Sequence, residues 1–259
     1  MSSIWRLLPQ FKAPGAVQMA LDSLLLDRHC QSDRSDRTHS VLRFYRWSPA
    51  AISLGYHQRE IPDRWHDLAI AQGLDLVRRP SGGRAVLHKG DLTYAVITSS
   101  HTNRRETYEY ICEFLIQGFA DLGIQLQYGK AGRGYMHNPN CFATATSADL
   151  VTSNGQKLIG SAQLYRHNSV LQHGSIAIQP DYDLLQQIFG IETPVVGLAE
   201  LLNPQNPINP AAIATDNTDN HDLDEDKLMD RAIAALTHAA EQHFGTQFED
   251  FPLDTLPES

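Results

Sequence analysis

Residues 149–178 read DLVTSNGQKLIGSAQLYRHNSVLQHGSIAI, three extended segments separated by two turns. The Asn154-Gly155 pair is a strong signal for a two-residue hairpin, and a second turn is expected at residues 167–169. Three strands joined in this way form an antiparallel meander, whose third strand is Val170–Ile178. Because antiparallel hairpins dominate, the sequence predicts an α+β fold with a mainly antiparallel sheet rather than a doubly wound parallel one.

The segments around this meander alternate between helical and extended patterns. Apolar spacing, glycine stop signals and a cap at Thr102 predict helices at Ala16–Cys30, Asp63–Gly73, Thr102–Leu122, Asp183–Phe189 and Lys227–Phe244. Short β-rich runs predict strands at Val41–Trp47, Ala51–Gly55, Asp75–Arg79, Arg84–His88 and Leu92–Thr98. We therefore expect a main domain over 1–200, a polar loop or linker over 201–226, and a C-terminal helix with a tail over 227–259, packed on the same domain.

The charge is unevenly distributed along the chain of 259 residues. Residues 1–170 hold 19 of the 21 lysines and arginines and 14 of the 30 acidic residues, a net charge of +5, whereas residues 171–259 carry −14. A mildly basic region can steer an acidic partner toward it. No basic stripe typical of nucleic-acid binding is present, so no nucleic-acid partner is expected.

Cysteine usage and hydropathy indicate the class of protein. Three cysteines do not suggest a disulfide framework, and no His or Cys spacing matches a metal motif, so no bound metal is expected. No apolar run approaches the roughly 20 residues that cross a bilayer, and residues 1–6 lack a signal-peptide pattern. We expect a cytoplasmic protein with no membrane partner, as a monomer.

The segment Arg78-Arg79-Pro80-Ser81-Gly82-Gly83-Arg84 combines cationic side chains with a glycine turn. Glycine lets another group approach the backbone closely, and guanidinium forks suit carboxylate or phosphate. Exposed amide N–H groups of such a turn also attract anions. The segment is therefore a candidate site for an anionic or polar acyl-type ligand.

Cys141 and Lys157 are candidates for nucleophilic chemistry. Cys141 lies in a loop-like stretch, and Lys157 follows the Asn154-Gly155 turn, so the hairpin can fold the lysine back toward the sulfur. A nearby ammonium favours the thiolate, which can attack a thioester. On pattern alone, the sequence favours a small buried hydrophobe for Cys141 and an exposed turn lysine for Lys157. Cys30 and Cys112 fall on apolar helix faces and are interpreted as core residues.

Two histidines have weaker signals. His173 precedes Gly174 in the third strand of the meander, and a glycine within a strand marks a bulge or a close approach. His173 is either a base or hydrogen-bond donor at a site, or a structural histidine, and the same alternatives hold for His88. Asp181 and Asp183 are interpreted as helix caps.

Three motifs together resemble one superfamily. The order RRPSGGRAVLH, GQKLIGSAQ and LQHGSI, with MALDSLLL, SPAAISLGYHQ and GDLTYAVI, is similar to the biotin/lipoate protein ligases and lipoyl or octanoyl transferases. The resemblance covers most of residues 1–200. It implies their biotin/lipoate-ligase (class II synthetase-like) fold, with 1–200 as the catalytic domain. Within it, Cys141-Phe142, Lys157 and Arg84 resemble the cysteine-dependent octanoyltransferases that look like lipoate ligases.

This resemblance implies an octanoyltransferase of lipoate biosynthesis. Octanoyl would pass from acyl carrier protein to a Cys141 thioester and then to a lysine of a lipoyl domain, as in the glycine cleavage H protein or the E2 subunits of 2-oxoacid dehydrogenases, with no cofactor. Val86, Leu87 and Leu158 would form the apolar slot. The implied catalytic residues are Cys141 and Lys157, and the implied substrate-binding residues are Arg78, Arg79, Ser81, Gly82, Gly83, Arg84, His88, Gly160, Ser161, Ala162, His173 and Gly174.

Three alternatives stay open at this point. A lipoate–protein ligase would use ATP and Mg²⁺, with Lys157 contacting the acyl-adenylate. An amidotransferase would take octanoyl from another lipoyl domain rather than from a carrier protein. A non-catalytic acyl-binding module would bind a fatty acyl group and form no acyl-cysteine.

Overall fold

The predicted meander forms three adjacent strands of an eight-stranded sheet in the computed structural model, which describes residues 4–31, 39–101, 103–129, 148–190, 194–203 and 224–252. The three strands are β8 (Asp149–Thr152), β9 (Lys157–Arg166) and β10 (Ser169–Ala177). Each pairs antiparallel with the next. Gly155 and His167 adopt positive φ angles of 80° and 51° in the two turns.

The other strands extend this sheet on both sides in the order β11-β1-β2-β6-β10-β9-β8-β7. They are β1 (Ile4–Ala13), β2 (His39–Trp47), β6 (Asp91–Ser99), β7 (Leu126–Tyr128) and β11 (Glu249–Asp250). Only the β11-β1-β2 pairings are parallel, and all the others are antiparallel. The predicted α+β class with a mixed, mainly antiparallel sheet is therefore confirmed.

A small second sheet carries the segment with the two adjacent glycines. It consists of β3 (Ala51–Leu54) between β4 (Asp75–Arg78) and β5 (Val86–His88). The Gly82-Gly83 turn lies between β4 and β5, so the two strands fix both of its ends. Gly55 at the end of β3 must be glycine, because a Cβ there would lie 1.8 Å from the carbonyl oxygen of Gly83.

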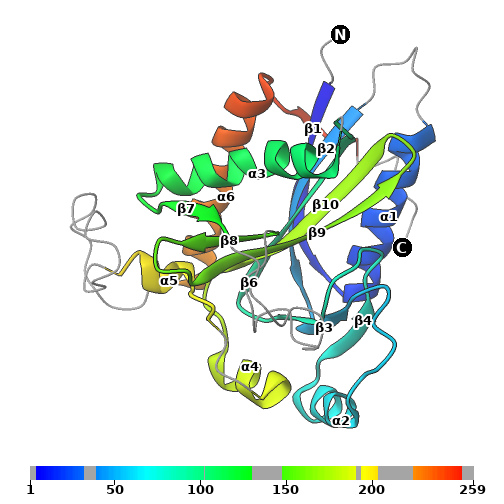
Figure 1. Cartoon of the computed structure of the whole chain (residues 1–259), viewed down its shortest axis with the longest axis vertical. Helices are drawn as coiled ribbons and strands as arrows, with labels where there is room; N and C mark the ends of the chain where they lie inside the picture. Colours follow the sequence, from blue (N-terminus) through cyan, green and yellow to red (C-terminus); the bar gives the residue numbers. More distant parts are fainter. Residues whose placement is uncertain are drawn as a thin grey trace.

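Helices cover both faces of the large sheet (Figure 1). On one face, α3 (Arg104–Asp121) crosses α6 (Glu225–Phe244), and α1 (Gly15–Gln31) lies along the other face. The shorter helices are α2 (Asp63–Gln72), α4 (Tyr182–Phe189) and α5 (Leu198–Leu201). Among the described residues, no helix is both long and apolar enough to cross a bilayer.

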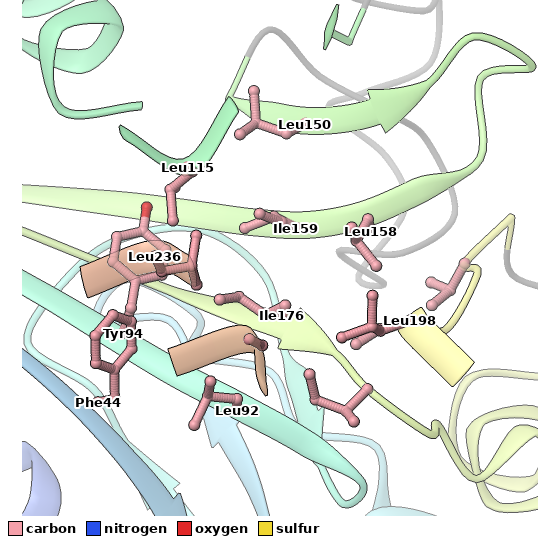
Figure 2. Packing of buried hydrophobic residues seen from close by; sticks show 14 of the residues in the cluster. Phe44, Leu92, Tyr94, Leu115, Leu150, Leu158, Ile159, Ile176, Leu198 and Leu236 are labelled. Carbon is pink, nitrogen blue, oxygen red and sulfur yellow. The ribbon is translucent and has the colours of Figure 1, made fainter. Parts of the chain in front are cut away.

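The main core lies between the sheet and α3 with α6. Leu150, Ile159 and Ile176 come from three neighbouring strands and meet Leu115 and Leu236 of the two helices (Figure 2). Every second residue of a strand faces this core, and the residues between them face α1, where a smaller cluster forms. Both faces of the central strands are thus buried, which makes the sheet a rigid support.

Most expected elements are present, and their bounds differ by a few residues. The capping residue of α3 is Asn103, whose side chain accepts a hydrogen bond from the Glu106 N–H at 2.9 Å, and not Thr102. Asp181 caps α4 as expected, accepting from the Leu184 N–H at 2.9 Å. The strands β1, β7 and β11 and the helix α5 were not predicted. Most of the expected linker at 201–226 lies outside the described residues.

Candidate functional site

The candidate site is a cavity of about 70 Å³ between the small sheet, α1 and the strands β9 and β10. Part of the wall is apolar, with Met19, Trp47 and Val86. Five of the predicted substrate-binding residues come from the strands β9 and β10: Gly160, Ser161, Ala162, His173 and Gly174. From that set, the small sheet adds His88, and the segment between β4 and β5 adds Arg79 and Gly83. The structure therefore brings residues from all three motifs to one cavity.

Lys157 is buried, which the exposed-turn interpretation did not anticipate. Its side chain is 2% exposed, and its Nζ lies 2.7 Å from Asp149 Oδ1 across the β8–β9 hairpin. Asp149, equally buried, lines the cavity. A Cβ on Gly160 would lie 2.6 Å from both Cε and Nζ of Lys157, so the glycine makes room for the lysine beside the cavity wall. The hairpin thus holds a paired ammonium directly behind the cavity.

The guanidinium of Arg79 organises the glycine turn and is not an open anion site, contrary to the expectation. Its Nε donates to Gly82 O at 3.2 Å, and Nη2 donates to Gly82 O at 2.8 Å and to Arg84 O at 2.7 Å. Nη1 donates to Ser53 O at 3.0 Å and to Ser53 Oγ at 3.1 Å. All five N–H donors of an arginine are therefore used within the protein.

Several other predicted binding residues do not line the cavity. Arg78 donates through Nη1 to Gly55 O at 2.8 Å and to Gln58 O at 2.6 Å, so it braces the loop after β3. Gly82 and the half-buried Arg84 contribute carbonyl acceptors to Arg79. Of the expected slot residues only Val86 reaches the cavity, because Leu87 and Leu158 belong to the main core.

His173 connects the cavity to a buried polar cluster. Its Nε2 lies 2.5 Å from Ser81 Oγ and its Nδ1 lies 2.8 Å from Asp22 Oδ2. Asp22, on α1, also accepts from Tyr45 OH and Arg43 Nη1, each at 3.0 Å. Ser81 is fully buried. It therefore holds the histidine ring and is not accessible as a nucleophile.

His88 lies in a second polar cluster, in which a histidine again lies between a serine hydroxyl and an aspartate carboxylate. Its Nε2 lies 2.8 Å from Ser53 Oγ and its Nδ1 lies 2.8 Å from Asp91 Oδ2. Ser175 and Thr93 also donate to this Asp91 oxygen, at 2.7 Å and 3.2 Å. The wall's polar groups are thus bonded to one another. A buried polar group that is already satisfied loses little when an apolar ligand lies against it.

The structure describes two of the three cysteines, Cys30 and Cys112, and Cys141 lies outside the described residues. Cys112 is fully buried on α3, and burial raises the pKa of its thiol to about 12. It is a core residue, as expected. Cys30 is half-buried at the edge of the smaller cluster, where its Sγ lies 3.4 Å from Arg166 O.

Sequence reasoning missed the residues of the cavity that come from outside the three motifs. They are Met19, Tyr45, Trp47, Ser53, Thr93, Ala148 and Asp149; within the third motif, Ser175 was also missed. Asp149 alone had a usable signal, since a hairpin at Asn154-Gly155 brings the preceding strand over the following one. Met19, Tyr45 and Trp47 carry no such local signal, because α1 and β2 reach the cavity only through the tertiary fold.

The chain belongs to the lipoyl protein ligase A/B catalytic domain family, whose model matches residues 14–215. This confirms the expected family and the expectation of an enzyme. The family match includes all three motifs that line the cavity.

Among known proteins, the chain is similar to octanoyltransferases named LipM. The one from Lysinibacillus sphaericus is 36% identical over 201 residues, which cover 73% of this chain and 71% of the relative. The one from Bacillus subtilis is 36% identical over 197 residues, which cover 71% and 69%.

Solved structures of lipoate ligases share the fold. A lipoate-protein ligase A bound with ATP has a TM-score of 0.68 at 19% identity, covering 97% of this chain and 89% of that one. A bipartite lipoate protein ligase from Thermoplasma acidophilum, described with its E2 lipoyl domain, has a TM-score of 0.65 at 20% identity, covering 96% and 87%. The expected biotin/lipoate-ligase fold is confirmed.

Proposed function

We propose that this chain is an octanoyltransferase that moves an octanoyl group from acyl carrier protein, through a thioester on Cys141, to a lysine of a lipoyl domain. The observation that carries the proposal is the buried ammonium of Lys157, 2.7 Å from Asp149, behind a cavity whose polar wall groups are bonded to one another. Identity of 36% to octanoyltransferases supports the same acyl group.

The first step of the proposed reaction forms an acyl-enzyme. The Cys141 thiolate adds to the thioester carbonyl carbon, and the C=O π pair moves onto oxygen. The oxyanion collapses, the bond to the carrier sulfur breaks, and the released thiolate takes a proton from water. In this proposal the Lys157 ammonium stabilises the thiolate and the oxyanion and keeps its own proton.

The second step makes the amide. The neutral amine of the acceptor lysine adds to the acyl-enzyme carbonyl carbon, the bond to Cys141 breaks, and the amine proton passes to solvent. No ATP is consumed, since the thioester already activates the acyl group. The aliphatic chain is taken up by the apolar wall of the cavity at about 0.8 kcal/mol per buried CH₂.

Intact-mass spectrometry tests this function. We expect wild-type protein mixed with octanoyl carrier protein to gain one octanoyl mass without ATP, to lose it in hydroxylamine, and to pass it to an added lipoyl domain. The variant Cys141→Ser should gain no hydroxylamine-labile adduct. Absence of an adduct, together with labelling of the lipoyl domain that requires ATP, would identify a ligase instead. An octanoyl lipoyl domain offered as the only donor separates the amidotransferase.

Replacing Gly160 by alanine is expected to reduce octanoyl transfer about 100-fold, because a misplacement of about 1 Å at a reacting group can have that effect. The new Cβ would fall 2.6 Å from Lys157 Nζ and displace it. Because that ammonium is buried and paired with Asp149, the thermal midpoint should also fall, so rates are compared below the melting temperature of the variant. The measurement is the initial rate of octanoyl transfer beside a melting curve. A rate near that of wild type would show that the ammonium position is unimportant.

A further inference from the structure

Ser161 lies where two hollows of the molecule meet. The cavity described above and a groove of about 510 Å³ share three lining residues, Ala148, Ser161 and Ala162. The groove also has Arg104 and Tyr128 on its walls. A thioester whose chain fills the cavity and whose carrier arm leaves through the groove would have its carbonyl at this junction.

A chain of five hydrogen-bonded side chains ends at Ser161. Tyr165 OH donates to Gln163 Oε1 at 2.9 Å, and Gln163 Nε2 donates to Gln172 Oε1 at 2.9 Å. Gln172 Nε2 donates to Tyr94 OH at 2.8 Å, and Tyr94 OH lies 2.8 Å from Ser161 Oγ. The series of bonds crosses three neighbouring strands, β9, β10 and β6, and its Tyr94 belongs to the main core (Figure 2).

The direction of this chain determines what Ser161 can do. Either hydroxyl of the Tyr94–Ser161 pair could donate to the other. We assign the Tyr94 hydrogen to Ser161 Oγ, because Tyr94 is fully buried, Gln172 Nε2 donates to it, and Ser161 Oγ is the acceptor among its hydrogen-bond partners in the described part of the chain. Burial raises the pKa of Tyr94 well above its usual range, which keeps this donor protonated. A hydroxyl has one hydrogen, and Ser161 Oγ already accepts from Tyr94. The Ser161 hydrogen therefore remains for another acceptor, and no described residue supplies one.

We propose that Ser161 is a further catalytic residue, which donates its hydroxyl hydrogen to the substrate's acyl carbonyl oxygen, and that Tyr94 is a positioning residue that fixes this donor. The proposal rests on the proposed function and names one contact within it. The carbonyl oxygen gains negative charge when a nucleophile adds to the carbon, so this hydrogen bond strengthens in the transition state. A fixed donor requires no reorientation at that moment, which is the basis of oxyanion stabilisation.

Single-turnover acylation by octanoyl carrier protein tests the Ser161 contact. We expect Ser161→Ala to slow acylation about 100-fold, the usual effect of removing one oxyanion donor, with the dissociation constant for the carrier within about twofold of wild type. The acylation rate of Ser161→Cys, whose thiol is a weaker hydrogen-bond donor, should lie between those of wild type and Ser161→Ala. Rates of both variants within about twofold of wild type would overturn the proposal.

A double-mutant cycle tests the role of Tyr94. Tyr94→Phe should slow acylation about fivefold, as expected for the loss of one net hydrogen bond, but should have no further effect when combined with Ser161→Ala. If the two substitutions had additive effects on the acylation rate, Tyr94 would have only a structural role and would not position Ser161. Tyr110→Phe is the matched control. It removes a tyrosine hydroxyl that is not part of this series of hydrogen bonds, and it should react like wild type.

An infrared measurement separates this proposal from the function on which it rests. With ¹³C-labelled octanoyl carbonyl, the bound acyl band should move to higher wavenumber in Ser161→Ala, because the carbonyl loses a polarising donor. An unchanged band would contradict the contact. If wild type proved to be an ATP-dependent ligase, the proposed transferase function would be wrong. The same carbonyl band, measured on the acyl-adenylate, would still test the contact with Ser161.

Discussion

Octanoyl transfer is expected to fall about 1,000-fold when Lys157 is replaced by methionine, a loss of about 4 kcal/mol of transition-state stabilisation. Methionine retains an unbranched apolar stem, one atom shorter than lysine, but has no charge. The ammonium lies 2.7 Å from Asp149 and against Gly160 of the cavity wall. Removing it takes away the ammonium that the proposed mechanism assigns to the thiolate and the oxyanion, so acylation by octanoyl carrier protein should be the step that slows.

The matched control is Lys89→Met, the same change at a lysine whose side chain is 44% exposed and is paired with Asp181. It should transfer octanoyl at the wild-type rate. Because Lys157→Met leaves a buried carboxylate at Asp149 without its cation, rates are compared below the melting temperature of the variant, and Lys157→Met/Asp149→Leu removes the carboxylate as well. If either folded variant acylated as fast as wild type, the proposed role of Lys157 would be wrong.

A loss of stability of about 3–5 kcal/mol is expected for Arg43→Met, the usual effect of removing one partner of a buried ion pair. Arg43 and Asp22 are both fully buried, with Nη1 3.0 Å from Oδ1. Methionine fills much of the volume of the arginine but leaves the Asp22 carboxylate without its cation. For a protein of this size the melting temperature should fall by roughly 6–20 °C.

Thermal and urea unfolding measure this effect. Arg105→Met serves as the control, since Arg105 is an exposed residue of α3 paired with Glu109 at 2.7 Å, and it should leave the midpoint almost unchanged. Equal midpoints for the two variants would show that the Arg43–Asp22 pair is not a source of stability. Asp22→Asn provides a second readout, because it also weakens the acceptor of His173 Nδ1.

Local signals were sufficient for the meander and for most helices. Asn154-Gly155 specifies a tight hairpin through backbone conformation alone, and glycines at 73, 123 and 245 follow the helices with positive φ. The strand β1 was missed because Pro9 interrupts its pattern. The structure accommodates it at an irregularity in the β1–β2 register between Leu8 and Phe11, which is where proline is tolerated in a strand.

The candidate site was only partly predictable. The motif residues that line the cavity were identified apart from Ser175, but the hydrogen-bond partners of Arg78 and Arg79 were not, because a sequence does not show which carbonyls a guanidinium meets. The burial of Lys157 follows from its partner Asp149 across the hairpin and not from its own neighbours in sequence. The bond between His173 and Asp22 joins residues 151 positions apart, a contact that only the tertiary fold defines. Cys141 stays a prediction.

The place of β10 in the sheet has a consequence for biosynthesis. This strand lies between β6 and β9 and supplies His173, Gly174 and Ser175 to the cavity, although it is one of the last strands along the chain. A nascent polypeptide that has emerged from the ribosome only as far as residue 168 contains the glycine turn, Asp22 and Lys157. It still lacks β10, the strand that joins β6 to β9. The pocket therefore assembles late and from distant segments, as the high sequence separation of its contacts requires.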